Sequence, residues 1–287
     1  SDIAVDSNGG LHIVYDRDVE SDDSISVPDE IMYLYRGPDF EEWHGPINVS
    51  CTQGQSTYPN LLLDREGHPW VFWLEDMGDT SHRPIKRTDY FWSKGEKGSF
   101  STPQSLFHCP SQSSILDQGI PLLDNEGRPC LIFPASLPFY ENDIWFTCYK
   151  TFFIDPILLP IRGTYLQPQL KEDGSLYLAY VSLSPDSNGG NALIYATLDP
   201  YNAQITGGPG DIYRDMNLPF ELNVTVTKRG YYAIWSEDTT GDLYPDLLLT
   251  ARSQDGEIWD SPYELGFVPG NWFELDATSD TFGSVHL

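Results

Sequence analysis

The sequence LLLDREGHPWVFW, from Leu61 to Trp73, decides the fold of this chain, because copies of it recur along the whole length. It consists of a short apolar run, a turn that ends at Gly67, and a second apolar run. Two such runs around an Asp-x-x-Gly turn are typical of a β-hairpin whose glycine takes a left-handed backbone. The copies are IAVDSNGGLHIVY from Ile3, PLLDNEGRPCLIF from Pro121, PQLKEDGSLYLAY from Pro168, VTVTKRGYYAIW from Val224 and the weaker LDATSDTFGSVHL from Leu275.

Each hairpin is followed by two further short runs of β-branched and aromatic residues. In the second unit these runs cover Asp89 to Ser93 and Gln104 to Phe107. No stretch shows a helical period. Four antiparallel strands in a unit of roughly 55 residues form the blade of a β-propeller. We therefore expect one all-β propeller domain over 1–287, with about six blades at about 1–51, 57–109, 116–161, 165–215, 219–268 and, in part, 272–287.

The sixth unit supplies only its first two strands. An unfinished blade leaves a sheet edge unpaired, and such an edge invites another strand. We expect either that more chain follows in a larger protein or that a neighbour completes the blade, which makes self-assembly through the open sixth blade one alternative.

The chain has 16 basic and 43 acidic residues, a net charge of −27. A surface this acidic repels nucleic acid phosphates and anionic lipid headgroups, so neither is an expected partner. No apolar run approaches the roughly 20 residues that cross a bilayer, so we expect no membrane insertion. The hydrophobic content of 40% is ample for a core.

The cysteines favour an oxidising compartment and so an extracellular or cell-surface protein. Cys130 and Cys148 lie opposite each other on neighbouring strands of the third unit, which suits a disulfide worth about 3 kcal/mol. Cys51 and Cys109 occupy matching positions in their units, and their pairing stays open, as does the alternative of free thiols. Asn48 in Asn-Val-Ser is a credible glycosylation site.

The fifth unit contains LLLTARSQDGEIWDSP, in which Ser253, Asp255, Gly256 and Trp259 approximate the pattern S-x-D-x-G-x-x-W with one residue fewer. This segment is similar to a degenerate Asp-box, and the chain resembles the sialidase-like, Asp-box (BNR) repeat propeller superfamily. The resemblance implies a propeller fold, which by itself does not give a function. Sialidases hold the substrate carboxylate with three arginines, and none of the ten arginines here stands in the motif of the first of them, so we do not expect a sialidase.

Ligands of propellers usually bind where the loops that enter the first strand meet the loops between the second and third strands. Aromatic rings beside amides and carboxylates at that mouth suit sugar rings. The basic run His82 to Arg87 could hold a uronate or sulfate, although pairing with nearby aspartates competes with this role. The ligand-binding candidates are Tyr58, Asn60, Glu75, Arg83, Arg87, Gln118, Tyr140, Tyr165, Gln167, Glu221, Trp272 and Glu274.

The loop EDTTGDLYPDLLL resembles the calcium-binding loops of integrin-type propellers. Its Asp238, Asp242 and Asp246 could contribute to the six to eight oxygens that Ca²⁺ takes. Calcium is thus a candidate cofactor, and a solvated acidic loop is the alternative.

Together these features predict a non-catalytic propeller that serves as a binding or structural module for a glycan or an extracellular protein. A carbohydrate-active enzyme, either a glycoside hydrolase or a polysaccharide lyase, is the first alternative. A subunit of an extracellular assembly closed by strand donation is the second. No residue is predicted to be catalytic.

Overall fold

The computed structural model describes most of the chain, namely residues 1–17, 29–39, 42–52, 54–76, 88–96, 98–108, 115–116, 119–136, 143–182, 191–267, 275, 277–280 and 283–286. The secondary structure of these residues is all β, arranged in antiparallel sheets. Among them is no helix long and apolar enough to cross a membrane.

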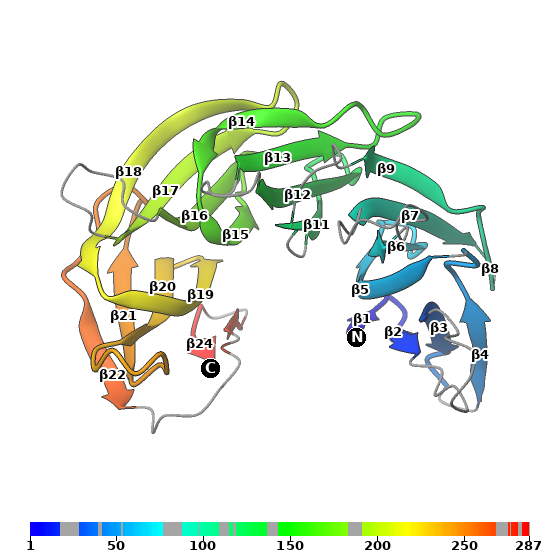
Figure 1. The fold of residues 1–287 in the computed structure, drawn as a ribbon, viewed down its shortest axis with the longest axis horizontal. Helices are drawn as coiled ribbons and strands as arrows, with labels where there is room; N and C mark the ends of the chain where they lie inside the picture. Colours follow the sequence, from blue (N-terminus) through cyan, green and yellow to red (C-terminus); the bar gives the residue numbers. More distant parts are fainter. Residues whose placement is uncertain are drawn as a thin grey trace, which may run out of the picture. The chain divides into compact units, whose positions relative to one another are not determined.

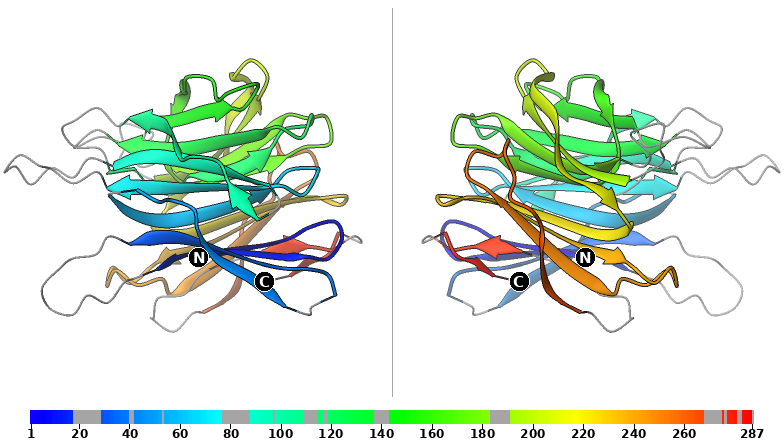
Figure 2. Two further views of the ribbon diagram at one scale, coloured as in Figure 1. Left: turned by 90° about the vertical axis from the view of Figure 1, so that its right-hand side faces the viewer. Right: turned by 90° about the vertical axis from the view of Figure 1, so that its left-hand side faces the viewer.

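The chain divides into two compact units. One comprises Ser1–Tyr140 and Trp145–Ile157, and the other Glu141–Ile144 and Leu158–Leu287. Within each sheet the strands follow one another mainly in chain order, as in a meander (Figure 1). The strands of a sheet run side by side with a pronounced twist (Figure 2).

The first unit contains two complete sheets. The first has the order β1-β2-β3-β4, and the second has the order β5-β6-β7-β8 with β9 also paired to β7. Their strands are β1 Asp2–Val5, β2 Leu11–Arg17, β3 Glu30–Arg36, β4 Trp43–Asn48, β5 Gln55–Leu63, β6 Pro69–Asp76, β7 Thr88–Glu96, β8 Ser99–Phe100 and β9 Gln104–His108.

A five-stranded sheet follows, in which β10 and β11 both pair with β12. Its strands are β10 Ile115–Leu116, β11 Ile120–Leu123, β12 Pro129–Ser136, β13 Asp143–Cys148 and β14 Ile157–Arg162. The boundary between the two units falls among these strands.

The second unit contains the sheets β15-β16-β17-β18 and β19-β20-β21-β22 and the two-stranded sheet β23-β24. Their strands are β15 Thr164–Leu170, β16 Leu176–Ser182, β17 Asn191–Asp199, β18 Gln204–Met216, β19 Leu218–Thr227, β20 Gly230–Asp238, β21 Leu247–Ser253, β22 Tyr263–Phe267, β23 Thr278–Ser279 and β24 Val285–His286. The four-stranded meanders expected from the repeat are therefore present, and the last hairpin has its two expected strands.

The six hairpin turns close as the sequence predicted, each with a glycine at positive φ. In four of them an aspartate at the first turn position also accepts the N–H four residues further on, at 2.8 Å in every case. These hydrogen bonds satisfy a backbone donor that the sheet cannot reach. The glycines are Gly9, Gly67, Gly127, Gly174, Gly230 and Gly283, and the aspartates are Asp6, Asp64, Asp124 and Asp280.

The second strand of the LLLDREGHPWVFW repeat is buried on both faces because a sheet packs against each. In the first unit, Val71 and Trp73 of β6 pack against the first sheet, around Val14. The alternate residues Trp70 and Phe72 pack toward β12. A strand covered on both sides reads as a continuous apolar run rather than an alternating one.

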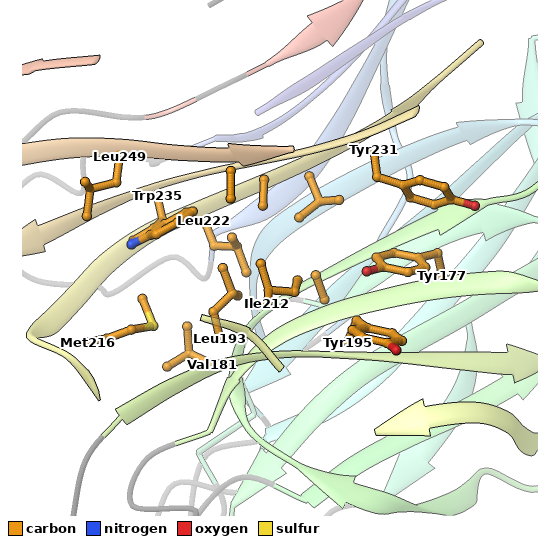
Figure 3. Close-up of a cluster of buried hydrophobic side chains, with 14 residues drawn as sticks. Tyr177, Val181, Leu193, Tyr195, Ile212, Met216, Leu222, Tyr231, Trp235 and Leu249 are labelled. Carbon is orange, nitrogen blue, oxygen red and sulfur yellow. The ribbon is translucent and has the colours of Figure 1, made fainter. Parts of the chain in front are cut away.

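The second unit has a corresponding core between its two four-stranded sheets. Val181 and Leu193 from one sheet meet Leu222 and Trp235 from the other (Figure 3). Each large side chain buried in this way stabilises the fold by about 1.5–3 kcal/mol. Face-to-face packing of consecutive meanders is the packing expected between propeller blades.

Cys130 on β12 and Cys148 on β13 form a disulfide, as predicted from their positions. Cys51 is exposed, with φ of 43°. Cys109 lies outside the described residues.

Candidate functional site

Two exposed tyrosines lie at corresponding bulges in the first strands of their sheets. The register of β5 against β6 shifts between Thr57 and Asn60, and that of β15 against β16 shifts between Thr164 and Gln167. The bulges contain Tyr58 and Tyr165, which have φ of 53° and 51°. Their exposed fractions are 59% and 38%.

This backbone conformation is costly for a tyrosine. A non-glycine residue at positive φ is uncommon, and a bulky one there costs of the order of 1–3 kcal/mol. Such strain persists where the surroundings over-determine it, and it is concentrated at binding and catalytic sites. β5 begins at Gln55, ahead of the apolar run that starts at Leu61.

An amide side chain accompanies each tyrosine two residues along the strand. Asn60 donates its Nδ2 to the carbonyl of Tyr58 at 3.4 Å. Gln167 is half-buried and lies opposite Ala179. In the fifth repeat the register shifts between Pro219 and Glu221, so that the half-buried Phe220 occupies the bulge.

A buried glutamate forms a hydrogen bond with the strand just before the first of these bulges. Glu75 is fully buried at the end of β6, and its Oε2 accepts from Ser56 Oγ at 2.7 Å and from Trp73 Nε1 at 3.0 Å. Ser56 lies two residues before Tyr58 on β5. The sequence pattern predicts that Glu75 contacts a ligand, whereas the structure buries it opposite Ser56.

The fifth repeat contains the same Trp-x-Glu arrangement. Glu237 is 2% exposed, and Trp235 Nε1 donates to its Oε1 at 2.8 Å. The backbone N–H and the amide Nδ2 of Asn217 both donate to Oε2 at 3.0 Å. Asn217 immediately precedes β19, so this glutamate also fixes the start of a first strand.

The two glutamates differ in the hydrogen bonding of one carboxylate oxygen. Both oxygens of Glu237 are hydrogen-bonded, whereas Oε1 of Glu75 has no hydrogen-bond partner within the described part of the chain. That oxygen faces the backbone of Gly54, since a Cβ on this glycine would lie 2.4 Å from it.

The remaining ligand-binding candidates divide into two groups. Glu221 is half-buried on β19, opposite Ser236. The others lie outside the described residues, namely Arg83, Arg87, Gln118, Tyr140, Trp272 and Glu274.

The three aspartates proposed for calcium accept hydrogen bonds within their own loop. Asp238 accepts from the backbone N–H groups of Thr240, Gly241 and Leu243. Burial acts to raise the pKa of Asp238, but these hydrogen bonds outweigh it and lower the pKa. The loop is completed by Asp246, which accepts from the backbone and hydroxyl of Thr239, and by Asp242, which accepts from the N–H of Tyr244.

These hydrogen bonds join the aspartates to the backbone and threonine hydroxyls of their own loop. Among the described residues, the acidic, histidine and cysteine side chains that come within 4.8 Å of one another in threes are Asp64, Glu66 and His68, and Asp124 with the disulfide cysteines. The proposed calcium ligands are not such a set. In the first group Lys94 Nζ already lies 3.2 Å from Asp64 Oδ2, which supplies the positive charge.

A histidine on β2 links the first turn aspartate to a buried tyrosine. His12 Nε2 lies 3.3 Å from Asp6 Oδ2, and its Nδ1 lies 2.7 Å from the hydroxyl of Tyr33. Burial lowers the pKa of His12, and burial raises that of Tyr33. A neutral imidazole can then donate from Nε2 to the aspartate and accept a hydrogen bond from the tyrosine hydroxyl at Nδ1.

These three residues border a pocket of about 210 Å³ that also includes His68 and Glu96. Sequence reasoning missed the contact between His12 and Tyr33, because it depends on the register of β2 against β3.

The segment with the Asp-box resemblance forms a closed turn after β21. Ser253 Oγ accepts the N–H of Gly256 at 2.8 Å, and Asp255 Oδ1 accepts the N–H groups of Glu257 and Ile258. Trp259 Nε1 donates to the carbonyl of Gly256 at 3.2 Å. The polar groups of the buried Ser253 and Gly256 are therefore paired inside one turn.

No family model matches the sequence, and no curated protein matches it. Solved structures are similar in fold at low identity. A protein of unknown function from Dyadobacter fermentans has a TM-score of 0.59 at 12% identity, covering 83% of this chain and 75% of that one.

Two further structures extend the likeness. A PL25 ulvan lyase bound to -[GlcA(1-4)Rha3S]- has a TM-score of 0.58 at 12% identity, over 91% of this chain and 68% of that one. The Hadza microbial sialidase Hz136 has a TM-score of 0.56 at 15% identity, over 92% of this chain and 57% of that one. At these identities the likeness shows the fold alone. The chain has an all-β propeller fold, similar to the folds of this ulvan lyase and this sialidase.

Proposed function

We propose that this protein is an extracellular or cell-surface β-propeller that recognises a glycan through its bulge tyrosines, Tyr58 and Tyr165. The observation that carries the proposal is their shared strained backbone together with their exposure. A strained and exposed aromatic residue at the same position of two repeats is the arrangement expected of a binding platform.

Each platform has the chemistry that a sugar ring needs. The apolar face of a pyranose stacks on an aromatic ring, and its hydroxyls pair with amides and carboxylates. Tyr58 has Asn60 beside it, and Tyr165 has Gln167. The buried Glu75 accepts from Ser56, which lies two residues before Tyr58 on β5.

The similar solved structures favour carbohydrate as the ligand class. One is a lyase bound to a saccharide of glucuronate and sulfated rhamnose, and another is a sialidase. The turn from Ser253 to Trp259 supports common ancestry with Asp-box propellers, because its serine, aspartate, glycine and tryptophan close one turn together. We accordingly propose that this segment is a degenerate Asp-box.

A glycan array followed by titration calorimetry on the best ligand tests the proposal. We expect Tyr58→Ala and Tyr165→Ala each to weaken binding at its own platform by up to about tenfold, since the contact with one aromatic ring contributes roughly 0.5–1.5 kcal/mol. Tyr263→Ala, which removes an exposed tyrosine from the outermost strand β22, is the matched control. Equal affinity in the wild type and both platform variants would refute the proposal.

A carbohydrate-active enzyme is the second candidate, because several proteins with this fold are lyases or hydrolases. It would need a general acid and a base beside the platform. Incubation with acidic and neutral polysaccharides, followed by chromatography of the products, distinguishes the candidates. Fragments that form with the wild type and not with Tyr58→Ala would favour the enzyme, and intact polymer with retained binding would favour recognition.

A further inference from the structure

Two adjacent hairpins of the second unit depart from the turn chemistry of the other repeats. Four turns begin with an aspartate that accepts the N–H four residues on. The turn between β15 and β16 begins with Lys171, and the turn between β19 and β20 begins with Thr227. The aspartate is therefore absent at two neighbouring turns.

Other groups close these two turns. Asp173 accepts from the N–H and hydroxyl of Ser175, at 2.9 and 2.6 Å. In the second turn Thr227 Oγ1 accepts the N–H of Arg229 at 2.9 Å and donates to the carbonyl of Gly230 at 3.1 Å. Both turns are therefore closed without an aspartate at their first position.

The two turns border an open pocket of about 730 Å³. Its lining includes Lys171, Lys228 and Arg229, together with Tyr231 and Gln254. Tyr231 belongs to a group of three tyrosine rings at one end of the core (Figure 3). Its ring lies 4.9 Å, centroid to centroid, from that of Tyr177. Tyr231, which lines the pocket, is therefore held in place by its packing against Tyr177.

The charge at the pocket contrasts with that of the chain. Only 16 of 287 residues are basic, yet three of them line this one pocket. A fourth, Arg252, donates Nη2 to the carbonyl of Arg229 at 2.9 Å and lies over the ring of Tyr232. Cations gathered in this way repel one another unless an anion joins them.

The lining also has three acidic residues, equal in number to its cations, and two of them are held by hydrogen bonds within their own hairpins. Asp173 is held by Ser175 and lies 3.7 Å from Lys171 Nζ, and Asp280 is held by the N–H of Ser284 and by His286. Lys228 and Arg229 are exposed, and neither makes an ion pair with any residue in the described ranges. Glu172 is the remaining acidic residue of the lining.

We propose that this pocket binds an oxyanion, a sulfate or a carboxylate group of an acidic saccharide. The guanidinium of Arg229 offers paired N–H donors that match such a group bidentately, and Lys228 and Lys171 add charge from either side. The volume accommodates a sugar unit attached to the anion, with Tyr231 as an apolar wall. The site lies at the hairpin turns, away from the bulge that contains Tyr165, and does not depend on the tyrosine platforms.

Titration calorimetry at low ionic strength tests this site with three probes: sodium sulfate, glucuronate, and a sulfated uronate-containing disaccharide. Glucose serves as the neutral probe. We expect the double variant Lys228→Ala, Arg229→Ala to bind the anionic probes at least tenfold more weakly than the wild type. The charge-matched control is Arg162→Ala, Arg214→Ala, which removes two exposed arginines elsewhere in the unit.

The pattern of binding separates the sources of the anion. Binding of the disaccharide much tighter than that of sulfate supports a saccharide ligand, and equal binding of both supports an oxyanion site without sugar contacts. Arg229→Lys, which keeps the charge, should weaken binding if the contact is bidentate. Unchanged binding in the double variant, or an equal loss in the control variant, would overturn the proposal. Unchanged thermal melting shows that the variants fold, because both altered side chains are exposed.

Discussion

The indole N–H of Trp235 donates to the carboxylate of Glu237, two residues further along β20, at 2.8 Å, and both side chains are buried. Residues two apart on a strand face the same side, so one strand supplies both donor and acceptor. The same arrangement joins Trp73 to Glu75. A buried carboxylate is tolerated only with such partners.

Replacement of Glu237 by alanine should therefore destabilise the fold by about 3 kcal/mol, since it leaves the indole donor of Trp235 buried and unpaired. Chemical denaturation measures the loss. Glu264→Ala removes an exposed glutamate of the same unit and should change stability by less than about 0.5 kcal/mol. Similar losses in both variants would mean that the buried hydrogen bonds contribute nothing.

Alanine at Gly54 should destabilise the protein by about 1–3 kcal/mol. The added Cβ would lie 2.4 Å from Oε1 of Glu75 and 2.6 Å from the carbonyl of Asp76, so the strand start must shift. Gly266→Ala is the control, because no atom lies within 4 Å of its Cβ position and its φ is not positive. Thermal melting of the two variants compares them, and an equally stable Gly54→Ala protein would contradict the described packing.

His12 should make stability depend on pH between 7 and 5. Burial lowers its pKa in the folded state from the ordinary 6.5, so the unfolded chain binds more protons as the pH falls. The contribution of His12 to the free energy of unfolding is fully present above about pH 6.5. It is lost as the pH falls toward the pKa of the folded state, by at most about 1.4 kcal/mol per pH unit.

Denaturation midpoints of the wild type and His12→Gln at pH 7, 6 and 5 measure this effect. The variant should show a flatter profile. The pKa of Asp6 is also lowered, so its contribution is lost only below its ordinary value of 3.8, outside this range. If the wild type and His12→Gln lose stability equally as the pH falls, groups other than His12 cause the pH dependence.

Glycine at Tyr58 should stabilise the protein by up to about 1 kcal/mol while it abolishes binding at that platform. Glycine adopts positive φ without the Cβ penalty, so the strain of the tyrosine is released. Thermal melting and glycan titration of Tyr58→Gly measure the two effects together. A loss of stability would mean that the ring of Tyr58 contributes to packing.

Removal of the disulfide by Cys130→Ala and Cys148→Ala should cost about 3 kcal/mol. The two cysteines are 18 residues apart, and the bond restricts the unfolded chain over that loop. Denaturant titration of the double variant against the oxidised wild type gives the difference. Equal midpoints would contradict the chain-entropy account.

The repeat by itself determined the hairpins. An apolar run, an Asp-x-x-Gly turn and a second apolar run specify both strands and the turn between them, because glycine at positive φ is a local requirement. The six glycines accordingly take that conformation, and the cross-strand position of Cys130 and Cys148 followed from counting residues outward from a turn.

Tertiary structure decided which polar residues face solvent. Glu75 and Tyr58 lie on the two strands of one hairpin, and the sequence predicted both as ligand-binding residues. In the structure Glu75 is fully buried and Tyr58 is exposed. Glu75 lies on β6, between its partners Ser56 of β5 and Asp89 of β7, whereas Tyr58 lies in the bulge where the register of β5 shifts against β6. The pocket between Lys171 and Arg229 also needed the fold, because residues of two different repeats meet there only when two sheets pack together.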